Sequence, residues 1–197
     1  MLTVDFNKLP LSPGSRVLDL GCGDGRHSRP VRMLDGVSLV AVDIGQDEVA
    51  RTAGSLAEMT DGTERSGPWM VLRASAYELP FADASFDCVI MSEVLEHLHE
   101  DRRALAEIGR ILKPGGTLAI SVPREGPEAL CWALSQEYRN SPGGHVRIYR
   151  RRKLERMIRE SGYEVFASHF AHALHTPFWW LKCLLGPSKE GLLPVEL

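Results

Sequence analysis

The fold is decided by the stretch VLDLGCGDGRHS at residues 17–28, in which an apolar run ends abruptly in three glycines at alternate positions. A buried strand that runs into a tight turn explains this order, because glycine tolerates the backbone conformations that such a turn needs. Without Cβ atoms, a ligand can lie against bare backbone, and the helix expected to begin near Gly25 offers unpaired N–H donors there. The stretch therefore predicts a cofactor cradle at Gly21, Gly23 and Gly25.

A second apolar segment indicates which kind of cofactor the cradle holds. Residues 38–42 (SLVAV) are typical of a buried strand, and Asp43 follows them ~20 residues after the turn, where an acidic side chain in this kind of fold binds ribose hydroxyls. The glycine spacing is GxGxG rather than the GxGxxG of dinucleotide sites, and Asp19 precedes it, so a carboxylate would repel a pyrophosphate. These features favour a nucleoside that carries positive charge. Asp19 either contacts that cation or caps the turn.

Four further motifs follow in order: AYELPF at residues 76–81, SFDCVI at 85–90, SEVLEH at 92–97 and LKPGG at 112–116. Together with the glycine turn, they resemble the class I S-adenosylmethionine-dependent methyltransferases over residues 14–170. The resemblance is closest to the branch that contains quinone-biosynthesis and small-molecule O-methyltransferases. It implies that S-adenosylmethionine is the cofactor and that its sulfonium makes a methyl group electrophilic.

The resemblance also implies a set of cofactor contacts. Asp19 is expected at the methionine end, Asp43 at the ribose, and Ser75 with the N–H of Ala76 at the adenine. The family often carries an acid where this chain has Ser75, so the adenine edge of the site is expected to be less polar here. The full expected set is Asp19, Gly21, Cys22, Gly23, Gly25, Asp43, Ile44, Ser75, Ala76 and Ser92.

Strand and helix patterns alternate along the chain. After the strands at residues 17–20 and 38–42, strands are expected at 70–72, 86–91, 117–122 and 163–170, and helices at 46–59, 101–112, 125–138 and 150–161. Strands that are apolar throughout, rather than at every second residue, require a parallel sheet covered on both faces. The predicted fold is therefore an α/β, doubly wound, Rossmann-like sheet with its ligand at the carboxyl edge of the strands. No segment matches the antiparallel seventh strand of the family.

Length and composition limit the organisation and the partners. A chain of 197 residues fits one domain, within which residues 123–150 are expected to form an acceptor lid and residues 171–197 an atypical tail. A net charge of -3 gives no overall attraction to nucleic acid or anionic membranes. The cysteines form no CxxC pair, and there is no leader pattern or apolar run of ~20 residues, so a cytoplasmic protein is expected.

Candidate acceptor residues lie in two places. Glu93 and His97 come at and just after the end of the strand at 86–91, on the edge where cofactor and acceptor should meet. His145 is the expected general base, since an ordinary histidine pKa of ~6.5 suits removal of a hydroxyl proton. Arg147 is expected to hold an anionic substrate group, with Tyr149 beside it. The alternatives are that His97 caps a helix and that the residues near His145 are solvated.

Two segments near the carboxyl end leave membrane contact open. Residues 147–159 are strongly basic, and residues 178–185 (FWWLKCLL) are rich in aromatic side chains. Such a pair of segments suits either a lipid boundary or a lipophilic acceptor, although a solvated helix face and core packing explain them equally well. His169, His172 and His175 recur at every third residue without a carboxylate, so no metal site is expected.

The predicted function is methyl transfer from S-adenosylmethionine to a small-molecule acceptor, at an oxygen nucleophile that is lipophilic in character. Two other classes stay open: a non-catalytic cofactor-binding or membrane-associated protein, and a nicotinamide-dependent reductase, which the glycine spacing and Asp19 disfavour. A nucleic-acid substrate is not expected, because the chain has no base-flipping motif. The pattern indicates no particular oligomeric state.

Overall fold

The computed structural model describes residues 2–59, 65–136 and 144–171. Its elements are η1 (Phe6–Lys8), β1 (Arg16–Leu20), α1 (Ser28–Arg32), β2 (Ser38–Asp43), α2 (Gln46–Ala57), β3 (Trp69–Arg73), β4 (Phe86–Ser92), η2 (Leu95–His97), α3 (Asp101–Ile111), β5 (Leu112–Ser121), α4 (Glu125–Leu134) and α6 (Arg151–Glu160). Here η1 and η2 are short 3-10 helices. The alternation of strands and helices predicted from the sequence is confirmed.

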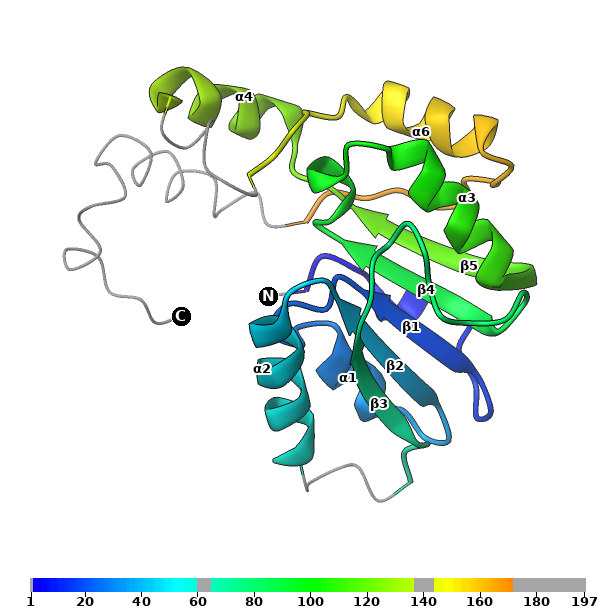
Figure 1. Cartoon of the computed structure of the whole chain (residues 1–197). Helices are drawn as coiled ribbons and strands as arrows, with labels where there is room; N and C mark the ends of the chain where they lie inside the picture. The colour runs from blue at the N-terminus through cyan, green and yellow to red at the C-terminus, as the bar shows by residue number, and fades with distance from the viewer. Residues whose placement is uncertain (1, 60–64, 137–143, 172–197) are drawn as a thin grey trace.

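The five strands form one sheet in the order β3-β2-β1-β4-β5, and every neighbouring pair is parallel. The chain winds outward from β1 through β2 to β3 and then returns to β4 on the other side of β1 (Figure 1). The carboxyl ends of β1 and β4 therefore lie side by side where the winding direction reverses. Sheets of this kind bind their ligands at that switch point.

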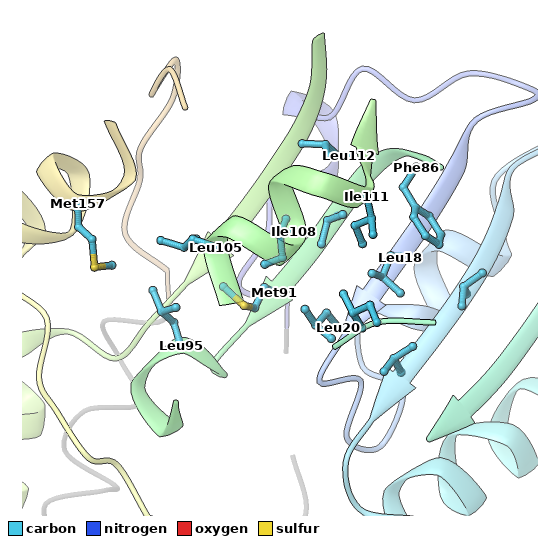
Figure 2. Packing of buried hydrophobic residues seen from close by; sticks show 14 of the residues in the cluster. Leu18, Leu20, Phe86, Met91, Leu95, Leu105, Ile108, Ile111, Leu112 and Met157 are labelled. Atoms are coloured by element: carbon cyan, nitrogen blue, oxygen red, sulfur yellow. The ribbon is translucent and has the colours of Figure 1, made fainter. Parts of the chain in front are cut away.

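The sheet is covered on both faces, because successive strand residues point to opposite sides. On one face, Leu18 and Leu20 of β1 pack with residues of α3 and with Met157 of α6, as Figure 2 shows. On the other face, Val17 packs with Val31 of α1 and with α2. Both faces of every central strand are thus buried, which explains why these strands are apolar at nearly every position.

Helix α3 shows how the sequence pattern produces one of these faces. Its buried residues recur at helical spacing and are Ala104, Leu105, Ile108 and Ile111. Arg103, on the opposite side, is exposed and pairs with Glu100 at 3.0 Å. Burial of each Leu or Ile stabilises the fold by ~1.5–3 kcal/mol, so α3 is held mainly by its apolar face.

Helix α6 carries much of the basic segment. Met157 is buried and Leu154 packs against the same core, whereas Arg151 and Arg159 reach Glu155 at 2.8 and 3.6 Å. The basic residues of this helix thus belong to a solvent-facing side. No helix in the described ranges combines the length and the apolar character that a membrane crossing requires.

Two boundaries differ from the sequence prediction. Helix α1 begins at Ser28 rather than near Gly25, although Pro30 lies in its first turn, where a missing N–H costs nothing. Strand β5 begins at Leu112 and includes the Pro-Gly-Gly segment that was expected as a turn before the strand. Its pairing with β4 shifts between Phe86 and Cys88, so these extra residues are taken up as an irregularity in the ladder.

The strand expected at residues 163–170 is wrong. These residues form no ladder in the structure, and β5 has no further described strand beside it. The period-two pattern is real, but Phe166 and Phe170 are exposed, and the guanidinium of Arg124 lies 4.8 Å from the centre of the Phe170 ring. Alternating side chains make a strand only where a partner backbone is available. Residues 172–197, which include the aromatic segment and two of the three spaced histidines, lie outside the described ranges.

Replacement of Ile108 by alanine tests the packing of α3. Because the Ile108 side chain is fully buried between α3 and the sheet, the change should lower the free energy of unfolding by ~2–5 kcal/mol in a urea titration. The control is Arg103→Ala on the exposed side of the same helix, which should change it by less than ~1 kcal/mol. Equal effects of the two variants would contradict the packing described above.

Candidate functional site

The turn after β1 passes directly against the turn after β4. The backbone of Gly21 has a φ of +74°, and its N–H donates to the Val42 carbonyl at 2.7 Å. A Cβ added at Gly21 would lie 2.2 Å from Cγ2 of Val94. At Gly23, in contrast, an added Cβ would meet no atom within 4 Å. The turn therefore presses one glycine against β4 and presents another, as bare backbone, to open space at the carboxyl edge.

Asp43 ties this turn to the end of β2. Its two carboxylate oxygens accept hydrogen bonds from the N–H groups of Gly23 and Gly45, at 2.9 and 3.0 Å. Thr52 of α2 also donates to the Gly23 carbonyl at 2.7 Å. An ionised carboxylate has about four lone-pair sites, so Asp43 retains acceptor capacity toward a ligand at the edge.

Asp19 is buried within β1, just before the turn. Ser28 Oγ donates to Asp19 Oδ2 at 2.5 Å, and burial raises the pKa of Asp19 to about 6. Ser28 is the first residue of α1, so the carboxylate joins the strand to the helix start. The turn-capping contact considered from the sequence is therefore present, and a cofactor contact would have to use the remaining acceptor positions.

The other expected cofactor residues also lie at this edge. Ile44 follows β2 and is 61% exposed, and Ser75 and Ala76 follow β3. Ser75 Oγ accepts from the Tyr77 N–H at 3.2 Å. Burial raises the pKa of Cys22 to about 12, which keeps it a neutral thiol. The residues predicted from sequence thus follow the ends of four neighbouring strands.

A cluster of hydroxyl groups joins the amino-terminal segment to β4 and β5. Thr3 Oγ1 lies 2.6 Å from Ser92 Oγ and 2.8 Å from Ser121 Oγ, and the two serine oxygens are 2.9 Å apart. The Thr3 N–H also donates to His27 Nε2 at 3.2 Å. Burial lowers the pKa of His27 to about 4, so the imidazole is neutral and accepts this bond. The segment before β1 therefore covers part of the edge.

Glu93 has an unusual backbone for its residue type. It follows β4 with a φ of +56°, a left-handed conformation that costs a residue with a Cβ ~1–2 kcal/mol. Ser121 Oγ donates to Glu93 Oε1 at 3.1 Å. Burial raises the pKa of Glu93, so its carboxylate binds a proton more readily than an exposed glutamate does. Strain of this kind is common at functional sites.

Beyond Glu93, two acidic and two imidazole side chains come together. His145 Nδ1 lies 2.6 Å from Glu128 Oε1, and His145 Nε2 lies 3.9 Å from Glu96 Oε1. The rings of His97 and His145 meet edge to face with their centres 4.8 Å apart. Burial raises the pKa of Glu96 to about 8. Burial opposes the charged form of His145, but the bond and charge of Glu128 raise the pKa of His145 overall.

The segment around His145 is anchored to η2 and α3. The Val146 N–H donates to the Glu96 carbonyl at 2.9 Å. Arg147 pairs with Asp101 and donates to the His99 carbonyl, and Tyr149 donates to Asp101 Oδ2 at 2.8 Å. Arg147 and Tyr149, which the sequence analysis expected to hold substrate, therefore have structural partners that fix the position of His145.

A cavity of about 1820 Å³ runs along β5, from the carboxyl edge to residues 163–171. Glu93, Glu128 and His145 line it near the edge, and apolar side chains such as Leu118 and Phe166 line it farther along. The glycine turn and Asp43 are not among its lining residues. The acidic and imidazole groups thus stand between the glycine turn and a largely apolar space.

Sequence reasoning identified His145, His97 and Glu93 but missed three residues of this region: Thr3, Glu96 and Glu128. Nothing in the sequence near Thr3 or Glu128 signals their positions, because each meets its partner only through the tertiary fold. Glu96 had a signal, since an acid between Leu95 and His97 in an otherwise apolar turn has to be buried or functional.

Comparison with known proteins gives the family of the chain. Residues 3–168 match the model of a family described as a methyltransferase domain. The chain is 31% identical over 175 residues to 27-O-demethylrifamycin SV methyltransferase of Amycolatopsis mediterranei, covering 87% of this chain and 62% of that protein. It is 30% identical over 165 residues to O-methyltransferase resE of Aspergillus sclerotiorum, covering 80% and 58%.

The fold has close relatives among solved structures. A SAM-dependent methyltransferase from Aquifex aeolicus superposes with a TM-score of 0.62 at 20% identity, covering 80% of this chain and 76% of that one. This likeness concerns the fold alone. The chain spans 58% to 62% of the length of the two curated relatives named above.

Alanine at Gly21 tests the contact between the two turns. The added Cβ would overlap Val94, and the left-handed φ adds strain, so Gly21→Ala should destabilise the protein more than Gly23→Ala by ~1–3 kcal/mol. Gly23 is the matched control because it is also left-handed but faces open space. Urea unfolding of both variants measures the difference, and equal midpoints would show that Val94 does not restrict Gly21.

Proposed function

Because this chain belongs to the class I S-adenosylmethionine-dependent methyltransferases, we propose that it methylates a hydroxyl oxygen of a small, lipophilic molecule. The observation that carries this proposal is the His145–Glu128 pair, which lies near Glu93 at the mouth of the cavity along β5. A hydroxyl acceptor must lose a proton, and these are groups able to take it. The printed names of two relatives, which specify O-methylation, agree with an oxygen acceptor.

The cofactor residues fit S-adenosylmethionine in kind and in place. The bare backbone of Gly23 faces open space next to Asp43, a carboxylate with acceptor capacity for ribose hydroxyls. Asp19 carries negative charge toward the methionine end, and Ser75 with Ala76 is assigned to the adenine. The proposed contacts are those expected from the sequence: Asp19, Gly21, Cys22, Gly23, Gly25, Asp43, Ile44, Ser75, Ala76 and Ser92.

On the acceptor side, Glu93 and His145 divide the work. When bound, S-adenosylmethionine supplies the electrophilic methyl group. Glu93 is close to the end of β4, and burial raises its pKa toward the range in which a carboxylate is an effective base. His145, oriented by Glu128, faces the same cavity and activates the acceptor oxygen. The hydroxyl proton passes to this pair as the oxygen–methyl bond forms.

The fold contributes alignment and exclusion of water. Arg147, Tyr149 and Val146 hold the His145 segment against η2 and α3, so the acceptor-side groups keep fixed positions relative to the glycine turn. Fixed alignment of two reactants can lower a barrier by ~7–11 kcal/mol in favourable systems. The apolar lining of the cavity favours acceptors whose remaining surface is hydrophobic.

Replacement of Asp43 tests the cofactor assignment without measuring turnover. Loss of hydrogen bonds to a charged acceptor costs ~1.5–3 kcal/mol, so Asp43→Ala should weaken S-adenosylmethionine binding ~10–100-fold in calorimetry. Asp47→Ala, an exposed acid in the first turn of α2, is the control and should bind as the wild type does. Asp43→Asn retains one acceptor for the Gly23 and Gly45 N–H groups and separates loss of ligand contact from disruption of the turn. Unchanged affinity in both Asp43 variants would refute the ribose assignment.

The acceptor class is tested with pairs of compounds that differ only in a hydroxyl. Mass spectrometry should show methylated product from lipophilic phenols or quinols, and none from the matched compounds that lack the hydroxyl. Glu93→Gln and His145→Gln should each lower kcat by ~100–10,000-fold, the usual contribution of acid–base groups. His99→Gln, at an exposed neighbouring histidine, should leave the rate unchanged. Methylation of the hydroxyl-free compounds would assign the enzyme to carbon or nitrogen acceptors.

A further inference from the structure

We propose that Glu96, His97 and His145 bind a divalent metal ion, with Glu128 as the outer partner that orients His145. Within the described ranges, one set of histidine, cysteine and acidic side chains is gathered closely enough for this, and it is these three residues. The sequence analysis expected no metal because it considered the spaced histidines at 169–175. The three residues proposed here lie far apart in sequence and meet at the carboxyl edge of the sheet.

The spacing of the donor atoms suits a single ion. One ligand atom from each residue lies within 4.8 Å of the others. An ion with bonds of ~2.0–2.2 Å to nitrogen and oxygen needs neighbouring donors ~3–3.5 Å apart. Side-chain rotation that brings the donors closer by about 1 Å satisfies this requirement, and it needs no movement of the backbone because His97 is exposed.

The state of Glu96 is an independent sign that a ligand belongs here. Its residue is 1% exposed, and neither carboxylate oxygen has a hydrogen-bond partner. Buried carboxylates are normally paired or bound to a metal, because an unpaired one costs several kcal/mol. Glu96 Oε1 points toward His145 Nε2 at 3.9 Å, too far for a hydrogen bond. A cation between these two atoms would satisfy the carboxylate.

The contact between His145 and Glu128 completes the arrangement. Metal-binding histidines usually give their second ring N–H to a carboxylate, which fixes the tautomer and the ring orientation. His145 Nδ1 is 2.6 Å from Glu128 Oε1, and Nε2 is the nitrogen that faces Glu96. The carboxylate therefore selects the tautomer in which Nε2 carries a lone pair toward the ion.

The donor set indicates the kind of metal. Two imidazole nitrogens and one carboxylate, with positions left for other ligands, are typical of zinc, manganese, iron or cobalt sites rather than of calcium sites. The cavity along β5 reaches His145 and Glu128, so a small ligand can approach the ion from that side.

The use of this metal in catalysis rests on the proposed function. An acceptor hydroxyl bound to the ion would have a lower pKa, which makes its oxygen easier to deprotonate. In that state His145 is a ligand, the hydroxyl proton moves to the Glu93 carboxylate, and the resulting alkoxide or phenolate takes the methyl group while the sulfonium becomes a neutral thioether. Glu93 lies near the cluster but is not among its three ligands.

Metal binding is measured on the full chain after dialysis against a chelator. Titration with Zn²⁺ in a calorimeter, and with Co²⁺ by visible absorption, should show one ion per chain with the spectrum of mixed nitrogen and oxygen ligands. His97→Gln and Glu96→Gln should weaken binding at least ~10-fold, and Glu128→Gln should weaken it by ~10–100-fold as an outer partner. His99→Gln and Glu93→Gln should leave binding unchanged.

Thermal unfolding of each variant shows that a lost signal does not arise from loss of the fold, and the exposed His97 is the safest position in this respect. Absence of stoichiometric binding by the wild type, or equal affinity in His97→Gln and His99→Gln, overturns the proposal. The outcome is separable from the proposed function: hydroxyl methylation at full rate in chelator, without metal binding, refutes only the metal site. Metal binding without methylation of any hydroxyl compound refutes only the acceptor class.

Discussion

The parallel pairing of β1 with β2 on one side and β4 on the other is the constraint on which the rest of the structure depends. It buries β1 on both faces and in both directions of the ladder, and it brings the turns that follow β1 and β4 to the same point. Those two turns are so close that Gly21 has no room for a side chain beside Val94. Everything proposed for this protein is built on the edge that this pairing creates.

The edge has two chemically different halves. The half formed by β1, β2 and β3 presents backbone N–H groups and the carboxylates of Asp19 and Asp43, with their positions fixed by hydrogen bonds to Ser28, Gly23 and Gly45. The half formed by β4 and β5 presents Glu93, strained into a left-handed conformation, and the imidazoles of His97 and His145. The first half suits a cationic nucleoside, and the second suits an oxygen nucleophile that has to lose a proton. The division follows from topology, because the chain crosses β1 between the two halves.

Burial sets the chemistry of the second half. Glu96 and Glu128 are carboxylates placed where water is largely excluded, and each needs a partner there. Glu128 has one in His145, whereas the oxygens of Glu96 have no hydrogen bond. A protonated acid and a metal-bound carboxylate are the two physical solutions for such a group. The nearby imidazoles favour the metal, since they supply nitrogen donors that an isolated protonated acid would not need.

The sequence by itself determined the fold class, the central strands and the cofactor half of the site, because each of these depends on local signals: apolar runs, a glycine turn and an acid that ends a strand. The acceptor half was predictable only in part. His145 stood out in its loop, but its partner Glu128 lies in another helix, and the approach of Glu96 and His97 depends on how that loop docks on η2 through Val146. The strand expected at residues 163–170 failed for the same reason, since alternation describes a side-chain pattern and only the tertiary structure decides whether a neighbouring backbone is there to pair with it.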